Sequence, residues 1–330
     1  MKKFMNLQLF AFEAQVTPGS PTVQPVNVTT QESLSPTMKT FYDTALLENA
    51  RAVMVFAQFG KKQPMKGNKV EWRKFNTFKK AMTPLQEGVI PTGQSFGMTS
   101  IEAETTQHGD FTAVSDRLEL ESYDDVIFGA TEEMGAAEGE TYDTLTRNIL
   151  VAGNSVMYCG GKTSRAEIDA SCVLTPNMVH RAATWLKKNK APKIDGCYVC
   201  IAHPSALYDL KESAEWKEFH KYNDTTPIFQ GEVGMLHGVR FIECNESKIW
   251  EGAKGKVYAS LFFGKDAYGV LDPEGEGMEM IIKTKGQIGG PLEQFSTIGY
   301  KFCHGAKILY QERMLRMESG SSLEAEDEEN

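Results

Sequence analysis

The chain has 330 residues, which favours two domains at about 150 residues each. Hydrophobic residues make up 41% and charged residues 24%, enough apolar side chains for a globular core. A net charge of −9 argues against a general nucleic-acid-binding protein, and the absence of any run of 18 apolar residues argues against a transmembrane helix.

The N-terminal region predicts an arm followed by a helix. Residues 1–12 resemble a signal peptide only faintly, because polar residues break a short apolar run. Residues 13–34 hold three prolines and no helical period, so we expect a disordered arm or one extended along a partner. Ser35 and Pro36 are a typical N-cap and first helical position, and the helical spacing that follows runs to Gly60.

Residues 61–110 predict a long hairpin. Apolar and polar residues alternate over residues 70–75 and again over residues 101–106, as in half-buried strands. About 20 residues rich in proline and glycine separate the two runs. Since two strands alone are marginally stable in water, a hairpin that projects from the body would need a partner surface.

Residues 124–159 predict one long helix, because apolar residues recur every three or four positions from Ile127 to Val156. Asp124 and Asp125 suit its N-terminal end, and Gly160-Gly161 would end it.

The remainder has an α+β pattern. Two helices are expected, one over residues 176–190 with Thr175 as its N-cap and one that begins after His203-Pro204 and includes Trp216. Strands are expected over residues 197–202, 239–243, 257–263, 268–271 and 278–283 and again within 293–316. The serine-rich and acidic residues 319–330 indicate a disordered tail.

Motifs for enzyme chemistry are present but lack their structural context. Cys197 and Cys200 have C-x-x-C spacing, yet there is no second pair and an offset of three in a strand points the two to opposite faces. Ser95 lies in G-x-S-x-G, but a strand-like run follows it where a nucleophile elbow needs a helix. The six histidines form no ligand pair, and the six scattered cysteines favour reduced, buried thiols. The sequence therefore predicts no catalytic residue, metal or cofactor.

Several stretches along nearly the whole chain carry a resemblance to a known family: MNLQLFA at 5–11, TPLQEG at 83–88, GEVG at 231–234 with GVRFIE at 238–243, VYASLFFGKDAYGV at 257–270 and PLEQFSTIGYKFCHGAKIL at 291–309. In sequence and in order, these stretches resemble the major capsid proteins of tailed bacteriophages, in the subfamily typified by an enterobacterial podovirus. Two positions depart from it, since Gly290 replaces the usual acidic residue and Tyr300 stands where tryptophan is common.

The resemblance implies an α+β protein with the Johnson fold. It divides the chain into an N-terminal arm and helix (1–60), an E-loop hairpin (61–110), a P domain (111–190) with a spine helix at about 123–159, an A domain (191–285), a return to the P domain (286–318) and the tail (319–330).

The implied function is self-assembly of hexamers and pentamers into an icosahedral shell around double-stranded DNA, without sequence-specific binding. Implied partners are further copies of the chain, a portal, and scaffold or decoration proteins, in a virion assembled in the host bacterial cytoplasm. In the E-loop, contacts with a neighbouring subunit are expected from Trp72 and Phe75 as apolar anchors and from Arg73, Lys79, Lys80 and Glu87 as ion-pair partners. A net charge of −9 suits a wall around DNA, because a basic wall would hold the DNA tightly.

Two other functions fit parts of the sequence. One is an encapsulin-like compartment shell, which would share the fold but enclose an enzyme. The other is a cytosolic hydrolase that uses Ser95 or a metal held by Cys197 and Cys200.

Overall fold

The computed structural model describes residues 54–330 apart from 66, 68, 77, 86, 89, 91–92, 122–125, 223–231, 274–276, 285–286, 289–291, 293 and 324–326. Most of the predicted N-terminal arm and helix therefore lies outside the described residues. The final part of that helix, residues 54–60, forms turns instead. The Asp143 carboxylate accepts the backbone N–H groups of Val55, Phe56 and Ala57 at 2.9, 3.1 and 3.0 Å, so these amides are not available to a helical ladder.

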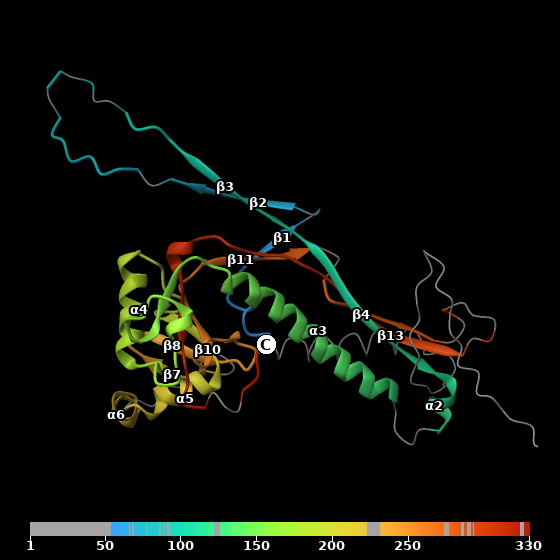
Figure 1. Cartoon of the computed structure of the whole chain (residues 1–330). Helices are drawn as coiled ribbons and strands as arrows, with labels where there is room; N and C mark the ends of the chain where they lie inside the picture. The colour runs from blue at the N-terminus through green and yellow to red at the C-terminus, as the bar shows by residue number, and fades with distance from the viewer. Residues whose placement is uncertain are drawn as a thin grey trace, which may run out of the picture.

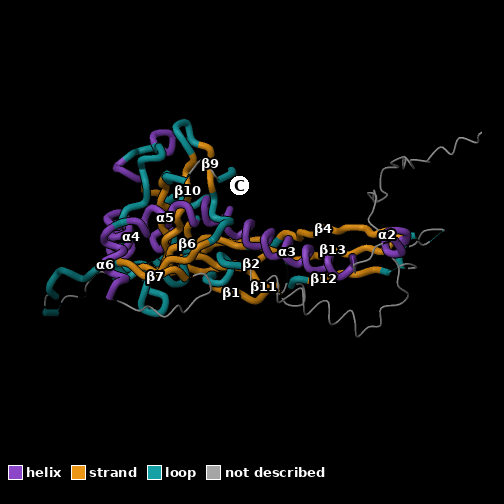
Figure 2. Tube along the Cα trace, turned by 90° about the horizontal axis from the view of Figure 1, so that it is seen from below, coloured by secondary structure: helices purple, strands orange, loops and turns teal. Residues whose placement is uncertain are grey.

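The molecule has two main parts, a body and an elongated spine (Figures 1 and 2). The body contains a sheet in the order β5-β15-β10-β6-β8-β7, with β9 paired to β10. Its strands are β5 (Val156–Tyr158), β6 (Tyr198–Ala202), β7 (Glu232–Leu236), β8 (Val239–Glu243), β9 (Ile249–Glu251), β10 (Lys256–Phe263) and β15 (Met314–Ser319). Its helices are α4 (Pro176–Lys188), α5 (Pro204–Glu212) and α6 (Ala214–Tyr222).

The body sheet is buried on both faces because the central strands β6 and β10 present apolar side chains to both sides. On one face, Cys200 and Phe262 pack with α4, whose buried side chains include Val179 and Leu186. On the other face, Ile201 and neighbouring residues pack against the end of α3. Each large apolar side chain buried here contributes about 1.5–3 kcal/mol. Residues 198–202 and 239–243 form the predicted strands in parallel pairing.

The spine consists of α3 (Val126–Val151) lying along a three-stranded sheet (Figure 2). The sheet order is β12-β13-β4, formed by β12 (Glu279–Lys283), β13 (Phe295–His304) and β4 (Thr106–Ser115). Ile127, Ala130 and Met134 on the predicted helical stripe pack against the buried face of this sheet. A short helix, α2 (Asp116–Glu121), follows β4.

The long helix ends at Val151, eight residues before the predicted end at Cys159. Arg316 of β15 donates to the carbonyl oxygens of Val151 and of Gly153, the latter at 3.2 Å, which satisfies acceptors at the helix end. Val156 then pairs in parallel with Arg316 as part of β5. The helical spacing of Ala152 and Val156 was therefore misleading, because a strand distant in sequence takes over these residues.

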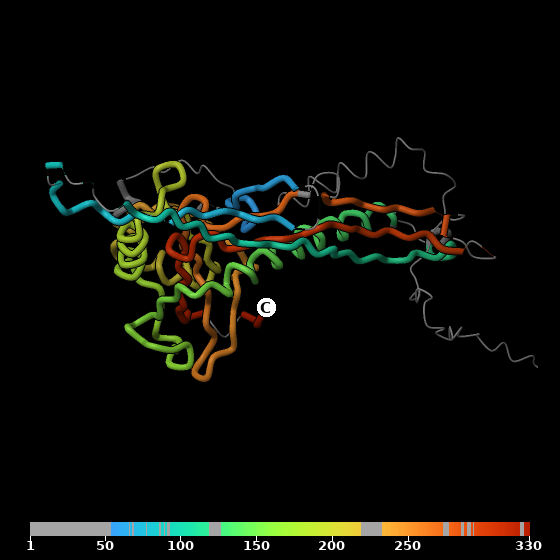
Figure 3. Tube along the Cα trace, turned by 90° about the horizontal axis from the view of Figure 1, so that it is seen from above, coloured from blue at the N-terminus to red at the C-terminus, as the bar shows by residue number. Residues whose placement is uncertain are grey.

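A third sheet joins the two parts. It has the order β1-β11-β14, with β1 (Lys61–Met65), β11 (Tyr268–Pro273) and β14 (Ala306–Ile308). The remaining pair is a separate hairpin of β2 (Lys69–Phe75) and β3 (Met98–Glu104). Since β3 leads almost directly into β4, the chain runs from the hairpin along the whole length of the spine (Figure 3).

The predicted helix after Pro204 is two helices, because Ser213 separates α5 from α6 in an extended conformation. The helix predicted at 176–190 begins at Pro176 after Thr175 as expected, and it ends at Lys188. Short 3-10 turns complete the description at Cys159–Gly161, Arg165–Glu167 and Gln311–Arg313.

The C-terminal residues pack on the body, unlike the disordered tail predicted from composition. Ser319 ends β15, and the Ser321 hydroxyl donates to the Ser205 carbonyl at 2.8 Å. Asp327 accepts from the Tyr258 hydroxyl at 2.6 Å, and the Asn330 side chain accepts from the Ile249 amide at 3.0 Å. Composition did not reveal these partners because they lie far away in sequence.

The body sheet also crosses the division of the chain implied by the resemblance. Its strands come from residues 156–158, from 198–263 and from 314–319, so they lie on both sides of the boundaries placed at 190 and 285. Strand β12, placed before the second boundary, belongs to the spine sheet.

Candidate assembly interface

The β2–β3 hairpin projects away from the body and ends in a long tip (Figure 1). Its antiparallel register places Lys69 opposite Glu104 and Phe75 opposite Met98. Lys69 and Glu104 form an ion pair, and the hydrogen bond and charge of Glu104 raise the pKa of Lys69. The predicted alternation is present, since exposed and half-buried residues alternate along β2.

The base of the hairpin is fixed to the rest of the chain. The Trp72 ring lies on Gly269 of β11, where an added Cβ would come within 2.8 Å of the ring. Trp72 also packs against a cluster that contains Met65 and Leu271. Lys74 lies 3.3 Å from Glu312 and 4.5 Å from the centre of the Tyr310 ring. Trp72, which we expected to anchor a neighbouring subunit, thus packs half-buried within its own chain.

The hairpin tip, residues 76–97, exposes an unusual amount of apolar surface. Phe96 packs in a tilted arrangement against Phe75 and Phe78 at centroid distances of 4.9 and 5.9 Å, yet all three rings remain more than half exposed. The large exposed apolar side chains of the tip and of the two strand ends beside it are Phe75, Phe78, Met82, Leu85, Ile90, Phe96 and Met98, between 51% and 93% exposed. Large apolar side chains left exposed together, as in the cluster of Phe75, Phe78 and Phe96, are typical of interaction sites.

Hydrogen bonds across the tip keep its two sides together. The Asn76 amide donates to the Gly97 carbonyl at 2.9 Å. The Gln94 side chain makes two hydrogen bonds with the backbone of Lys79, at 2.7 and 2.8 Å. The tip therefore continues the hairpin beyond the last strand pair.

The charged residues predicted for the interface are exposed on this hairpin. Arg73 lies 3.5 Å from Glu71 on the same strand. Lys79, Lys80 and Glu87 are exposed, and within the described part of the chain they form no ion pair with one another or with the body. They are available to charges on another molecule.

Sequence reasoning missed most of the apolar tip. It named Phe75 but treated the segment between the strands as a loose loop marked by its prolines and glycines. The missed residues are Phe78, Met82, Leu85, Ile90 and Phe96. The sequence did contain a sign of this surface. Large apolar residues in a loop without strand or helix periodicity are not expected to pack into the core of their own subunit.

The hydrolase and metal hypotheses gain no support from the geometry. Ser95 is exposed in the tip, and the strand β3 follows it after two residues. Cys200 is fully buried in β6, where burial raises its pKa well above the usual value, and the Cys197 sulfur lies 3.3 Å from that of Met235. Among the described residues, no three His, Cys, Asp or Glu side chains are grouped as metal ligands.

The helices give a further negative result. Among those that the structure describes, none combines the length and apolar character needed to cross a bilayer.

Comparisons with known proteins identify a matching family model and solved structures with a similar fold. A family model described as phage capsid protein matches residues 148–271. No curated protein matches the chain. The fold is similar to the capsid of Ralstonia phage GP4, with a TM-score of 0.64, 14% identity, and coverage of 97% of this chain and 98% of that one.

Two cyanophage capsids are similar to the same extent. For cyanophage Pam1 the TM-score is 0.62 at 11% identity, over 94% of this chain and 100% of that one. For cyanophage P-SCSP1u it is 0.61 at 13% identity, over 94% of both chains. The similarity in fold extends over nearly the full length of these chains, so the chain has the Johnson fold of phage capsid proteins.

Proposed function

We propose that the chain is the major capsid protein of a tailed bacteriophage, in the subfamily typified by an enterobacterial podovirus. It assembles into hexamers and pentamers that close an icosahedral shell around packaged double-stranded DNA. The observation that carries this proposal is the apolar hairpin tip, where Ile90 is 93% and Met82 81% exposed at the end of an arm.

The physical argument is the cost of leaving this surface in water. Burying one such side chain against a partner contributes about 1.5–3 kcal/mol, and the tip carries several. The tip and whatever surface receives it are different parts of the same molecule. Contacts of this head-to-tail kind generate closed rings when the rotation between copies is suitable.

The domain names of the family are proposed here for ranges of the chain, which cut across the body sheet described above. The hairpin with its flanking residues 61–110 is the E-loop. The P domain takes residues 111–190, with the spine helix, and 286–318, while the A domain takes residues 191–285. The N-terminal arm and helix take residues 1–60.

The intersubunit contacts proposed for the E-loop use its exposed residues. Phe75 contributes apolar area, while Arg73, Lys79, Lys80 and Glu87 form ion pairs with neighbours. Trp72 has a different role in this proposal, because it fixes the angle at which the E-loop leaves its own subunit.

The other proposed partners are those that a shell around DNA requires. The net charge of −9 keeps the protein from binding the packaged DNA tightly, and no sequence-specific contact is expected. A portal and scaffold or decoration proteins complete the particle, which is built in the cytoplasm of the host bacterium. The role is structural and needs no catalytic residue or cofactor.

The test is assembly of the protein expressed alone, followed by light scattering and negative-stain electron microscopy. Rings, tubes or shells are expected. A variant with Met82, Leu85 and Ile90 changed to serine should remain folded and dispersed. The matched control changes Glu71 and Glu102, which face each other on the hairpin strands, to serine and should assemble normally. A wild-type protein that stays monomeric at every concentration, with crowding agent and also when it is co-expressed with the neighbouring genes of its native source, contradicts the proposal.

A second candidate is a cellular compartment shell. The fold is also similar to a virus-like particle from Pyrococcus furiosus, with a TM-score of 0.51 and 10% identity over 85% of this chain and 99% of that one. Particles purified from the native source distinguish the two functions, since a capsid contains DNA and a compartment contains protein cargo.

A further inference from the structure

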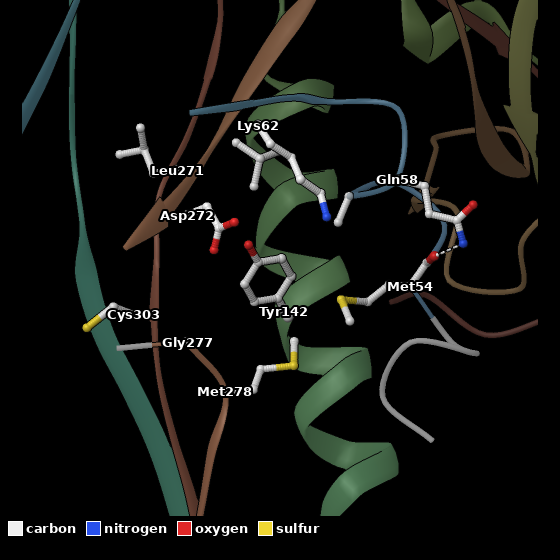
Figure 4. A pocket seen from close by; sticks show the side chains of 11 residues that line it. Met54, Gln58, Lys62, Tyr142, Leu271, Asp272, Gly277, Met278 and Cys303 are labelled. Atoms are coloured by element: carbon white, nitrogen blue, oxygen red, sulfur yellow. Dashed lines mark hydrogen bonds between the residues drawn. The ribbon is translucent and has the colours of Figure 1, made fainter. Parts of the chain in front are cut away.

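A cavity of about 580 Å³ lies where the spine meets the third sheet (Figure 4). Tyr142 of α3 forms one wall, and β11 contributes Leu271 and Asp272. Met54 and Met278 line it from two separate loops. Methionine side chains adapt to different shapes, so these walls suit an apolar side chain inserted from outside.

Three polar groups face the same cavity. The Lys62 ammonium, the Asp272 carboxylate and the Tyr142 hydroxyl are turned towards the space between them (Figure 4). Neither Lys62 nor Asp272 forms an ion pair with another described residue. Burial and the negative charge of Asp272 raise the pKa of Tyr142 to about 12, so its hydroxyl keeps its proton. The cavity thus offers one cation and one anion around an apolar centre.

The hairpin tip has the complementary pattern. Met82 and Leu85 are 81% and 76% exposed, and they lie between Lys80 and Glu87. Thr83 lies in a bend, so the segment presents its apolar residues at a turn. The hairpin carries this tip away from its own subunit, so an occupant with this sequence comes from another copy (Figure 1).

We propose that this cavity receives the hairpin tip of a second copy of the chain. Leu85 of the tip enters between Met54 and Met278, Glu87 pairs with Lys62, and Lys80 pairs with Asp272. The inference rests on the proposed self-assembly and adds to it the surface on which the tip docks.

Disulfide trapping tests the apolar contact. The double variant Leu85→Cys, Met278→Cys is assembled, oxidised with oxidised glutathione and run on a non-reducing gel. Each bond formed joins two thiols and reduces one glutathione disulfide to two thiols. All variants also carry Cys303→Ser, because Cys303 lines the same cavity and would itself lie within reach of the Leu85→Cys thiol. A ladder of covalent multimers is expected, and each single variant controls for the remaining native cysteines. The matched control pairs Leu85→Cys with Lys283→Cys, an exposed position on β12 outside the cavity, and should give no ladder.

Charge reversal tests the ionic contacts. Lys80→Glu and Asp272→Lys should each lower the yield of particles at least about tenfold, because each places like charges together. The combination of both changes should restore the yield, since the pair is re-formed with opposite polarity. Thermal melting of the dispersed subunits checks that each variant folds.

The outcomes separate this inference from the proposed function. Particles that form without a specific Leu85–Met278 ladder, or a double charge reversal that stays as defective as the single ones, leave the capsid role intact and overturn the docking site. That result would assign the cavity to another segment or to a small ligand. A wild-type chain that never assembles overturns both.

Discussion

Glu138 is an unusual residue of the spine helix, because it is fully buried and, within the described part of the chain, neither of its carboxylate oxygens has a hydrogen-bond partner. Removal from water disfavours the charged form and raises its pKa from 4.5 to about 7. The folded protein therefore binds more protons than the unfolded chain between these values. Its stability contribution is fully present below pH 4.5 and is lost as the pH rises through about 7.

Glu138→Gln should remove this pH dependence. A difference of this size corresponds to a free energy on the order of 3 kcal/mol, so the variant should be more stable than the wild type at pH 8 and similar to it at pH 4. Denaturant unfolding of dispersed subunits at several pH values measures this. Glu132→Gln, at an exposed position on the same helix, is the control and should change nothing. The same pH slope in wild type and Glu138→Gln would contradict the prediction.

Glu318 is buried too, but its charge is compensated. Arg165 donates to its two oxygens at 2.8 and 2.7 Å, and Arg316 donates at 2.8 Å. The Arg165 guanidinium also lies 3.5 Å from the centre of the Trp250 ring. These contacts join the loop before α4 to β15 and β9.

Glu318→Gln should destabilise the subunit by about 3–5 kcal/mol, because it leaves the partly buried Arg165 and Arg316 guanidinium groups without their counter-charge. The free energy of unfolding in urea measures the loss. Glu167→Gln changes a partly exposed carboxylate of the neighbouring 3-10 turn, which accepts from the Thr163 amide at 3.1 Å, and it should cost much less. Equal losses for the two variants would show that the buried network does not stabilise the body.

At the scale of elements, the C-terminal segment differs most from the disordered tail that its composition predicts. It follows β15, and its described residues bind α5, β9 and β10. The 11 residues after Ser319 include five acidic side chains. One of them, Asp327, nevertheless accepts hydrogen bonds from the Lys256 and Tyr258 side chains. The segment therefore packs across the body and links three of its elements by hydrogen bonds.

Deletion of residues 320–330 should lower the thermal unfolding midpoint of the subunit. Each hydrogen bond lost contributes about 0.5–1.5 kcal/mol, so the total is a few kcal/mol. Tyr258→Phe, which removes only the hydroxyl that binds Asp327, should lose a fraction of this. Differential scanning calorimetry of both variants makes the comparison. An unchanged unfolding midpoint after the deletion would mean that the C-terminal segment does not stabilise the body.

For the whole molecule, folding and assembly should be separable. The hairpin tip contributes little to the core, whereas Trp72 and Lys74 fix the hairpin below it. Replacement of residues 77–96 by a short glycine-serine linker should leave the unfolding midpoint of the subunit within a few degrees of the wild type. The same variant should form no particles by light scattering. A variant that both folds and assembles would show that the tip is not the interface.

The sequence by itself determined the features that depend on local chemistry. Thr175-Pro176 predicts the start of α4, the alternation from Val70 to Phe75 predicts a strand, and the stripe from Ile127 to Met134 predicts the face of α3 that packs on the sheet. In each case the side chains that define the pattern are neighbours along the chain, so their period is visible without the fold. The resemblance to phage capsid proteins added the global architecture.

Only the tertiary structure decided what depends on partners distant in sequence. Arg316 sets the end of α3, Gly269 gives Trp72 its place within its own chain, and Tyr258 holds the acidic tail. The exposure of Leu85 and Ile90 likewise appears only once the core is seen to form without them. The physical reason is the same throughout: hydrogen bonds, ion pairs and packing act between atoms that are close in space, and local patterns carry no record of which distant residue will be there.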